Sequence, residues 1–294
     1  MDFENFVFKN NLGTIEKNYT FKELTTIGCG GRIKILYTPN SIEALQKAFI
    51  FIEEHQLSFF LLGNGSNVLA RDEDYEGIVI HLRKMPYSYT IDGEILECSA
   101  FYPTTKLAYD LAKEEMGDLS FLGGIPGLLG GAIYNNSGAY KDDIKNHLID
   151  VTYINSAGQM VTLANKDCAF SYRKSIFHYI DAIILSARFK ITKVKTLDIL
   201  EKRKSQRKLT QPLENRSMGS IFKNNPLIPA WKVIDALGMR GFHFHDAAVS
   251  AKHANFIINT GNAKSSEILN LIEIIQKRAE LEFGISLKYE ITIV

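Results

Sequence analysis

Glycine crowds one apolar stretch of this chain, and that stretch limits the fold more than any other feature. Residues 119–140 have the sequence LSFLGGIPGLLGGAIYNNSGAY. Because glycine lacks a Cβ, its backbone can approach a ligand or another chain segment closely. A second glycine loop, GNGSN at residues 63–67, lies between the apolar runs FFLLG and GIVIHL. Consecutive amides in tight turns form anion-binding nests, so the two loops predict a cradle for phosphates.

Neither loop has the spacing of a common nucleotide-binding motif. Residues 63–67 lack the third glycine of G-x-G-x-x-G, and G-x-x-x-x-G-K-[ST] occurs nowhere in the sequence. A Rossmann or P-loop interpretation is therefore poor. Ser66 and Asn67 would add side-chain donors to a bound anion, but a structural turn explains such a loop about as well, since Gly and Asn are common turn residues.

Composition excludes several classes of protein. The chain has 294 residues, 46% of them apolar, and a formal net charge of +1, so no global field attracts nucleic acid or membrane. The N-terminal sequence MDFENFVFKN has acidic residues where a secretory signal has basic ones. Cys29, Cys98 and Cys168 stand far apart and are expected to be reduced thiols. We expect a cytoplasmic protein with no nucleic-acid or membrane partner.

Hydrophobic spacing predicts the first elements. Ser41 is expected to cap a helix over SIEALQKAFIFIEEHQL, and strands are expected at 58–62 and 77–82. Short β-rich runs follow, with a helix around 103–116. These patterns indicate a small α/β unit followed by an α+β unit.

A third unit is expected after a polar, basic segment. Residues 201–212, EKRKSQRKLTQP, form either a linker or a helix with a solvated face. Helices are predicted at WKVIDALGMRG and from Ser265 to the residue before Gly284, and a strand at 287–294. The sequence thus predicts boundaries near residues 84 and 198.

Three residues stand in settings that suit chemistry. Arg173 lies among aromatics in FSYRKSIF, where a guanidinium would bind a carboxylate. Ser220 lies in MGSIFKNNP between a glycine and an apolar pair, and Glu290 lies in the terminal strand, drawn into an apolar setting. Each has a structural alternative: an arginine stacked at a domain boundary, a strand with a turn, and an ordinary strand residue.

A metal site is a weaker hypothesis. His243, His245 and His253 with Asp246 suggest one, but no carboxylate or thiolate cluster completes a familiar ligand set. Surface or hydrogen-bonded histidines are the favoured interpretation, and no metal is expected. A nucleophilic role for a cysteine has no nearby base to support it.

Taken together, the motifs resemble one family. NVLARD after GNGSN, FLGGIPGLLGGAIYNNSGAY, FSYRKSIF, QPLENRSMGSIFKNNP and VSAKHANFIINTGNA occur in the order found in UDP-N-acetylenolpyruvoylglucosamine reductases, the UDP-N-acetylmuramate dehydrogenases of bacterial peptidoglycan precursor synthesis. The resemblance spans about residues 25–294. Little room for an extra loop lies between Arg173 and Arg207, which makes the chain similar to the shorter subclass.

The resemblance implies a fold and a cofactor. The fold would be α+β, with a p-cresol-methylhydroxylase-type FAD-binding fold of two α/β subdomains, 1–84 and 85–198, and a C-terminal α+β substrate-binding domain, 199–294. NADPH would be the reducing co-substrate. The glycine loops would hold FAD through Gly63, Asn64, Gly65, Ser66, Asn67, Gly124, Ile125, Pro126, Gly127 and Gly131.

It also implies a reaction, the reduction of UDP-N-acetylglucosamine enolpyruvate to UDP-N-acetylmuramate. Hydride would pass from NADPH to flavin N5 and then to C3 of the substrate, with Ser220 protonating C2. Arg173 and Glu290 would polarise the carboxylate and stabilise the enol-like intermediate. The expected partners are these small molecules, bound by a monomer whose further substrate contacts are Tyr172, Arg207 and Asn224.

Two alternatives remain open at this point. A flavin oxidase or dehydrogenase of the same fold, acting on another alcohol or sugar, would use oxygen rapidly or carry covalent flavin. A nucleotide-sensing or structural module would keep the loops without the chemistry, and absence of flavin would favour it.

Overall fold

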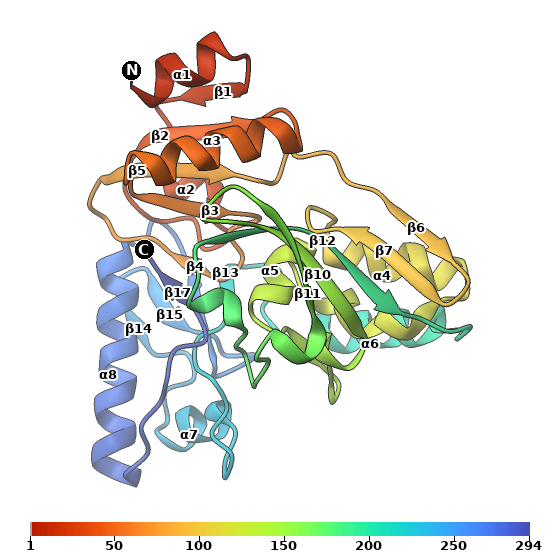
Figure 1. Ribbon diagram of the computed structural model, residues 1–294. Coiled ribbons are helices and arrows are strands. Elements are labelled where there is room, and N and C mark those ends of the chain that lie inside the picture. The colour runs from red at the N-terminus through yellow and green to blue at the C-terminus, as the bar shows by residue number, and fades with distance from the viewer. Residues whose placement is uncertain (1) are drawn as a thin grey trace. The chain divides into compact units, whose positions relative to one another are not determined.

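The computed structural model describes residues 2–294, which form two compact units (Figure 1). The first takes the chain up to residue 17 with residues 35–63 and 76–204, and the second takes residues 18–34, 64–75 and 205–294. The chain therefore passes between the units several times. The predicted domains 1–84, 85–198 and 199–294 stay a prediction.

The first sheet of the first unit has the strand order β1-β2-β5-β3. Its strands are β1 (Gly13–Glu16), β2 (Ile33–Pro39), β3 (Phe59–Leu62) and β5 (Tyr75–His81). Figure 1 shows α3 (Ile42–Glu54) running over this sheet, where its apolar side buries Leu45 and Phe49. As predicted, Ser41 caps α3, because its side chain accepts the N–H of Ala44 at 3.0 Å. A short helix, α1 (Phe3–Lys9), packs into the same core.

The second sheet of the first unit is antiparallel, in the order β11-β10-β12-β7-β6. Its strands are β6 (Tyr89–Asp92), β7 (Ile95–Ser99), β10 (Leu148–Asn155), β11 (Met160–Ala164) and β12 (Ala182–Lys190). The predicted helix α4 (Thr104–Lys113), the 3₁₀ segment Gly117–Gly124 and α5 (Leu129–Tyr134) share one apolar core with it. The glycine-rich stretch is therefore folded into helical turns whose apolar residues are core.

The sheet of the second unit has the order β13-β16-β15-β14. Its strands are β13 (Arg216–Ser220), β14 (His243–Phe244), β15 (Ala247–Val249) and β16 (Phe256–Asn259). Two helices, α7 (Ala230–Ala236) and α8 (Ser265–Phe283), pack into its core. Separately, β4 (Val68–Leu69) pairs in parallel with β17 (Thr292–Ile293).

The ends of α8 follow from the sequence. Asp72 accepts the N–H groups of Ser265 at 2.7 Å and Ser266 at 2.9 Å, which satisfies donors that a helix start leaves unpaired. The helix ends at Gly284, whose φ of +65° is left-handed as in many helix C-caps. Asp72 is the last residue of the NVLARD motif, and its contacts with the start of α8 give this motif residue a structural role.

The structure decides the secondary structure of two segments for which the sequence made predictions. The basic segment at 201–212 is largely helical, within α6 (Leu197–Thr210). The predicted strand at 287–294 is wrong in extent, because only β17 forms a ladder and Tyr289 makes an isolated bridge to Phe222. Glu290 therefore lies between these pairings, outside a regular strand.

Smaller elements complete the chain. They are α2 (Phe21–Leu24), β8 (Gly138–Ala139), β9 (Asp142–Asp143) and the 3₁₀ turns Ile144–Asn146, Asn165–Asp167 and Ile176–His178. Within residues 2–294, no helix combines the length and the apolar character that crossing a bilayer requires.

Candidate functional site

Ser220 and Glu290 are close neighbours along two backbones of the second unit. Ser220 ends β13, and the carbonyl of the next residue, Ile221, accepts the N–H of Glu290 at 2.8 Å. One step further, Phe222 bridges to Tyr289. The structure therefore brings together two of the three residues predicted to be catalytic, through pairing between segments far apart in the sequence.

A glycine shapes the approach to Ser220. Gly219 has a φ of +79°, a conformation that side chains other than glycine adopt at a cost. The register between β13 and β16 shifts between Ser217 and Ser220, so the strand is irregular just before the serine. The glycine before Ser220, noted in the sequence, is required by this backbone turn.

The glycine loop at 63–67 contacts the segment that carries Glu290. Its last residue, Asn67, donates its side-chain amide to the Glu290 carbonyl at 3.1 Å. Its own carbonyl accepts the N–H of Thr292 at 2.9 Å, next to the β4–β17 pairing. One residue of the predicted cofactor loop therefore fixes the backbone that carries Glu290.

Asn255 supports Ser220 and Glu290, and sequence reasoning assigned it no role. Its side-chain oxygen accepts the N–H of Phe222 at 3.0 Å, and its amide donates to the Phe222 carbonyl at 2.8 Å. Asn255 is 3% exposed, so these bonds are shielded from water. The only signal was its place inside the quoted motif VSAKHANFIINTGNA, where an amide precedes an apolar run.

Arg173 lies in the first unit and adopts a left-handed backbone, with a φ of +54°. Its guanidinium donates to the Gly138 carbonyl at 2.7 Å and to the Asn136 carbonyl at 3.4 Å. The ring of Tyr172, 49% exposed, lies 5.0 Å from the guanidinium carbon. An arginine held in an uncommon backbone conformation by several contacts fits a site that needs a cation at a fixed point.

Asn224 and Arg207 belong to the second unit. The side-chain oxygen of Asn224 accepts the N–H of Ala230 at 3.1 Å, at the start of α7. Arg207 is half-buried on α6. Their predicted contacts with substrate stay predictions.

The backbone of the glycine-rich segment is suited to hold a ligand such as FAD. Thr104 fixes it from one side: its hydroxyl donates to the Ile125 carbonyl, and its N–H donates to the Gly127 carbonyl at 3.1 Å. Gly127 has a φ of +142°. A Cβ added to Gly131, in the first turn of α5, meets no atom within 4 Å beyond its chain neighbours and the backbone of its own helix. The segment is thus rigid on the protein side and open to close approach at Gly131.

The loop at 63–67 is likewise held by protein contacts on one side. Gly65 has a φ of +60°, and a Cβ there would lie 2.4 Å from the Leu24 carbonyl oxygen. The Gly65 carbonyl accepts the N–H of Thr26 at 3.1 Å, so this acceptor points into the protein. Such a turn suits an anion, because the Gly65 carbonyl, which would repel a diphosphate, is engaged by Thr26. Both glycine loops therefore fit FAD.

Comparisons with known proteins agree with these features. A family profile described as "FAD binding domain" matches residues 33–164, and one described as "UDP-N-acetylenolpyruvoylglucosamine reductase, C-terminal domain" matches residues 211–294. A UDP-N-acetylenolpyruvoylglucosamine reductase from Halalkalibacterium halodurans is 32% identical over 96% of this chain and 95% of its own length. One from Clostridium novyi is 35% identical over 95% of this chain and 92% of its own.

The chain belongs to the UDP-N-acetylenolpyruvoylglucosamine reductase family. The crystal structure of UDP-N-acetylenolpyruvylglucosamine reductase from Thermus caldophilus matches it with a TM-score of 0.80 at 28% identity, over 96% of this chain and 99% of that one. The predicted family and the α+β fold with an FAD-binding part are confirmed.

The cysteines and histidines do not offer an alternative reactive site in this member of the reductase family. Cys98 and Cys168 are buried free thiols, and burial raises the pKa of Cys168 to about 11 and that of Cys98 further, which keeps both protonated. His253 accepts the N–H of Asn255 at 3.3 Å if its Nδ1 is unprotonated, and burial, then Arg240, lowers its pKa. Among residues 2–294, no three His, Cys, Asp or Glu side chains gather as metal ligands.

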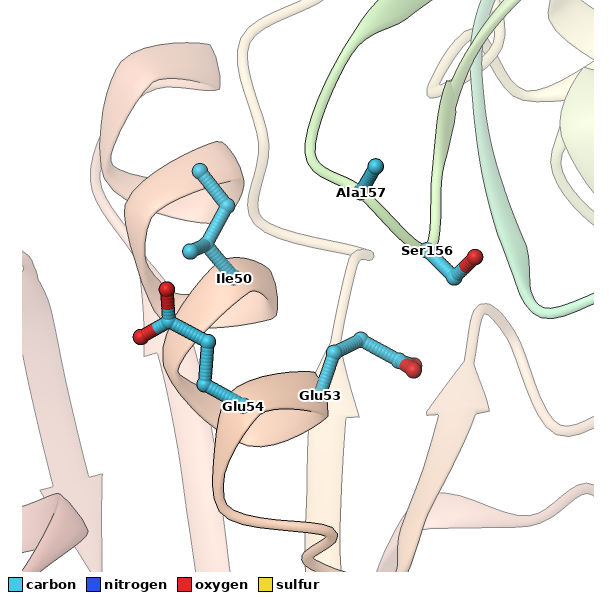
Figure 2. Close-up of a pocket in the computed structure, with 5 residues that line it drawn as sticks. All are labelled: Ile50, Glu53, Glu54, Ser156 and Ala157. Carbon is cyan, nitrogen blue, oxygen red and sulfur yellow. The ribbon is translucent and has the colours of Figure 1, made fainter.

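A shallow hollow in the first unit lies outside these features. Figure 2 shows the residues that line it, which are Ile50, Glu53 and Glu54 of α3 and Ser156 and Ala157 of the β10–β11 turn. Burial, and then the nearby charge of Asp181, raises the pKa of Glu53. None of the predicted site residues lines this hollow.

Proposed function

We propose that this chain reduces UDP-N-acetylglucosamine enolpyruvate to UDP-N-acetylmuramate, with NADPH as the reductant and FAD as the cofactor. The observation that carries the proposal is the hydrogen bond from the Glu290 N–H to the carbonyl of Ile221, the residue after Ser220, in a member of this reductase family. A proton donor and an acid that belong to one task have to lie close together.

Residues 63–67, residues 124–127 and Gly131 would hold the FAD. The loop carbonyls engaged by Thr26 and Thr104 leave the glycine backbone shaped for close approach to a diphosphate. When bound, FAD supplies a hydride carrier between NADPH and C3 of the enolpyruvyl group. The chain's own residues bind the substrate, orient it and deliver the proton.

Arg173 is proposed to bind the substrate carboxylate. Hydride addition at C3 moves the electron pair of the C2–C3 double bond toward C2 and its carboxylate. A guanidinium already fixed by two backbone carbonyls stabilises that charge without reorganising first. Tyr172 stacks on the same guanidinium and is proposed to contact the substrate as well.

Ser220 is proposed to give its hydroxyl proton to C2, with Glu290 stabilising the enol-like intermediate. A serine hydroxyl is a weak acid, so it serves only when held within hydrogen-bond reach of the carbon. The paired backbones at Ile221 and Glu290 give that fixed position. The hydride, the proton and the two carbons together balance the reduction of the double bond.

The other parts of the proposal concern the nucleotide-sugar contacts, the oligomeric state and the compartment. Arg207 is proposed to bind the diphosphate of the nucleotide sugar, and Asn224 its sugar part. We propose a monomer. We propose the cytoplasm as its compartment, which agrees with three buried free cysteines.

The anaerobic visible spectrum of the purified holoprotein tests the reaction. NADPH is expected to bleach the flavin absorbance, and the enolpyruvyl substrate is expected to restore it promptly. In Ser220→Ala, bleaching should proceed at the wild-type rate while the return slows by roughly 10²–10³-fold, the usual cost of a lost transition-state donor. NADH in place of NADPH reports the preference for the nucleotide.

The matched control is Ser217→Ala in the same strand. Ser217 contacts Thr26 through its backbone carbonyl, at 2.6 Å from the Thr26 hydroxyl, so alanine keeps that bond and should change the return rate less than twofold. A normal return in Ser220→Ala contradicts the serine's role. No return in the wild type excludes this substrate, and rapid oxygen use would favour the oxidase alternative.

A further inference from the structure

Asn136 is a fully buried polar residue beside Arg173, and its side chain has no role in the proposed function. Its side chain and backbone are 0% exposed, in a left-handed conformation with a φ of +41°. Asparagine tolerates this conformation better than most residues. A buried amide of this kind costs free energy unless its donors and acceptor are all satisfied.

Every polar atom of the Asn136 side chain has a partner in a different segment. The amide donates to the Ser171 carbonyl at 3.0 Å and to the Asp143 carboxylate at 3.3 Å. The side-chain oxygen accepts the N–H of Lys145 at 3.1 Å. One side chain therefore ties the segment before Arg173, the strand β9 and the turn after it to a single point.

Those ties fix both carbonyls that hold the guanidinium. One of them is the carbonyl of Asn136 itself, and the other belongs to Gly138, at the start of the β8–β9 hairpin that ends at Asp143. The hairpin turns at Tyr140 and Lys141, whose φ values of +58° and +68° suit a tight turn that other contacts have to stabilise. Without the Asn136 side chain, the hairpin keeps its own backbone pairing but loses its ties to the segment before Arg173 and to Lys145.

We propose that Asn136 is the positioning residue for Arg173: its side chain sets the two carbonyls that aim the guanidinium at the substrate carboxylate. The proposal rests on the role given to Arg173 under the proposed function. Asn136 acts through Arg173 and does not itself touch the reacting atoms. A displacement of about 1 Å at a charge-stabilising group costs roughly 10²-fold in rate.

Asn136→Asp tests this with nearly the same shape. The aspartate keeps an acceptor for Lys145 but replaces both donors, and it places a second carboxylate beside Asp143, whose Oδ1 is buried with no partner within residues 2–294. We expect flavin bleaching by NADPH within twofold of wild type. We expect the return with enolpyruvyl substrate to slow roughly 10- to 100-fold.

A binding measurement gives a readout that does not depend on turnover. Titration calorimetry with UDP-N-acetylmuramate, whose carboxylate remains after reduction, should show at least tenfold weaker binding to Asn136→Asp. UDP, which lacks the carboxylate, should bind within twofold of wild type. A purely structural defect would weaken both ligands alike and would contradict the proposal.

The matched control is Asn165→Asp. Asn165 also donates its amide to two carbonyls, those of Lys145 and Leu148, each at 2.8 Å, but it contacts neither Asn136 nor the carbonyls that hold Arg173. It should lower the melting temperature while leaving the return rate within about threefold of wild type. If Asn136→Asp does not fold, Asn136→Gly tests the same point, because glycine accepts the backbone conformation without a side chain.

Arg173→Ala separates failure of this inference from failure of the proposed function. If Arg173→Ala returns the flavin spectrum at the normal rate, the role of the arginine is wrong. If Arg173→Ala is slow and both Asn136 variants are normal, the positioning role is wrong. In the double variant Arg173→Ala/Asn136→Asp, the second change should cost less than threefold, because the group that it positions is already gone.

Discussion

Arg173 and Glu290 are both charged residues assigned to one reaction, but their surroundings differ in kind. Arg173 lies in a loop where its guanidinium bonds to the carbonyls of Asn136 and Gly138. Glu290 is placed by its backbone, through its N–H to Ile221 and its carbonyl to Asn67. The side chain of Arg173 is therefore held by carbonyls of another segment. Hydrogen bonds of its own backbone set much of the position of Glu290.

The backbone conformation around Arg173 also differs from that around Ser220 and Glu290. Near Arg173, several residues other than glycine have left-handed backbones, among them Asn136, Tyr140, Lys141, Ala169 and Arg173. Near Ser220, the left-handed position is occupied by Gly219. Strained conformations persist only where surrounding contacts hold them, so we expect the Arg173 loop to respond more strongly to single substitutions.

Among the substitutions that test this comparison, Arg173→Lys should have the largest effect. Lysine keeps the positive charge but lacks the planar fork that bonds to two carbonyls at once, so it cannot occupy the same fixed point. We expect the return of the flavin absorbance with enolpyruvyl substrate to slow roughly 10²-fold, with bleaching by NADPH unchanged. Stopped-flow absorbance measures both phases.

The neighbouring cation is the control for Arg173→Lys. Lys174 lies 4.5 Å from the ring of Tyr179, and Lys174→Ala should change the return rate less than twofold. A fully active Arg173→Lys would mean that charge alone suffices, and the geometric contrast between the two regions would then have no functional meaning.

Asn67→Ala should have a smaller effect on the same phase. It removes the 3.1 Å bond to the Glu290 carbonyl but keeps the backbone bonds from Thr292 to Asn67 and from Glu290 to Ile221. We expect the return to slow only about 3- to 10-fold, near the cost of one hydrogen bond. Flavin affinity is measured separately by fluorescence, since Asn67 is also assigned to the cofactor loop.

A 100-fold loss in Asn67→Ala at full flavin occupancy would break the comparison. It would mean that Glu290, like Arg173, depends on one particular side chain for its position. The loss in return rate is then compared with that of Asn136→Asp at matched flavin occupancy. This comparison shows whether Asn67 or Asn136 contributes more to the reaction.

The sequence predicted regular elements where local chemistry decides them. Ser41 before α3, and Gly284 after α8, lie where capping preferences put them. The strand over 287–294 was overextended, because an apolar pattern does not reveal whether a partner strand runs alongside. Only Thr292 and Ile293 find one, in β4.

The sequence singled out the members of the proposed site but not the residues that support them. Ser220 and Glu290 came from motifs, but their adjacency depends on pairing between distant segments, which spacing cannot show. Asn136 and Asn255 escaped notice because an asparagine in a glycine-rich or polar context suggests a turn. Their importance becomes visible only when burial shows that each amide bonds to several segments.

Asp72→Asn should have the smallest effect on catalysis and act on stability alone. Asp72 belongs to the second unit, where its carboxylate accepts the N–H groups of Ser265 and Ser266 at the start of α8. The neutral amide keeps an acceptor but loses the charge that the helix N-terminus favours. We expect a loss of about 0.5–1 kcal/mol in unfolding free energy at pH 7, measured by urea denaturation, and return kinetics within twofold of wild type.

The pH dependence of that difference identifies its cause. Burial raises the pKa of Asp72, but the hydrogen bonds from Ser266 and Ser265 outweigh it, so the folded-state pKa lies below its ordinary value. A lowered folded pKa means that the unfolded chain binds the proton more tightly, so stability is present above the unfolded pKa of about 3.9 and is lost as pH falls through the folded value. The gap between wild type and Asp72→Asn should therefore close on acidification below pH 4. A gap that is constant from pH 7 to pH 3 would assign the stabilisation to packing and not to the charge of Asp72.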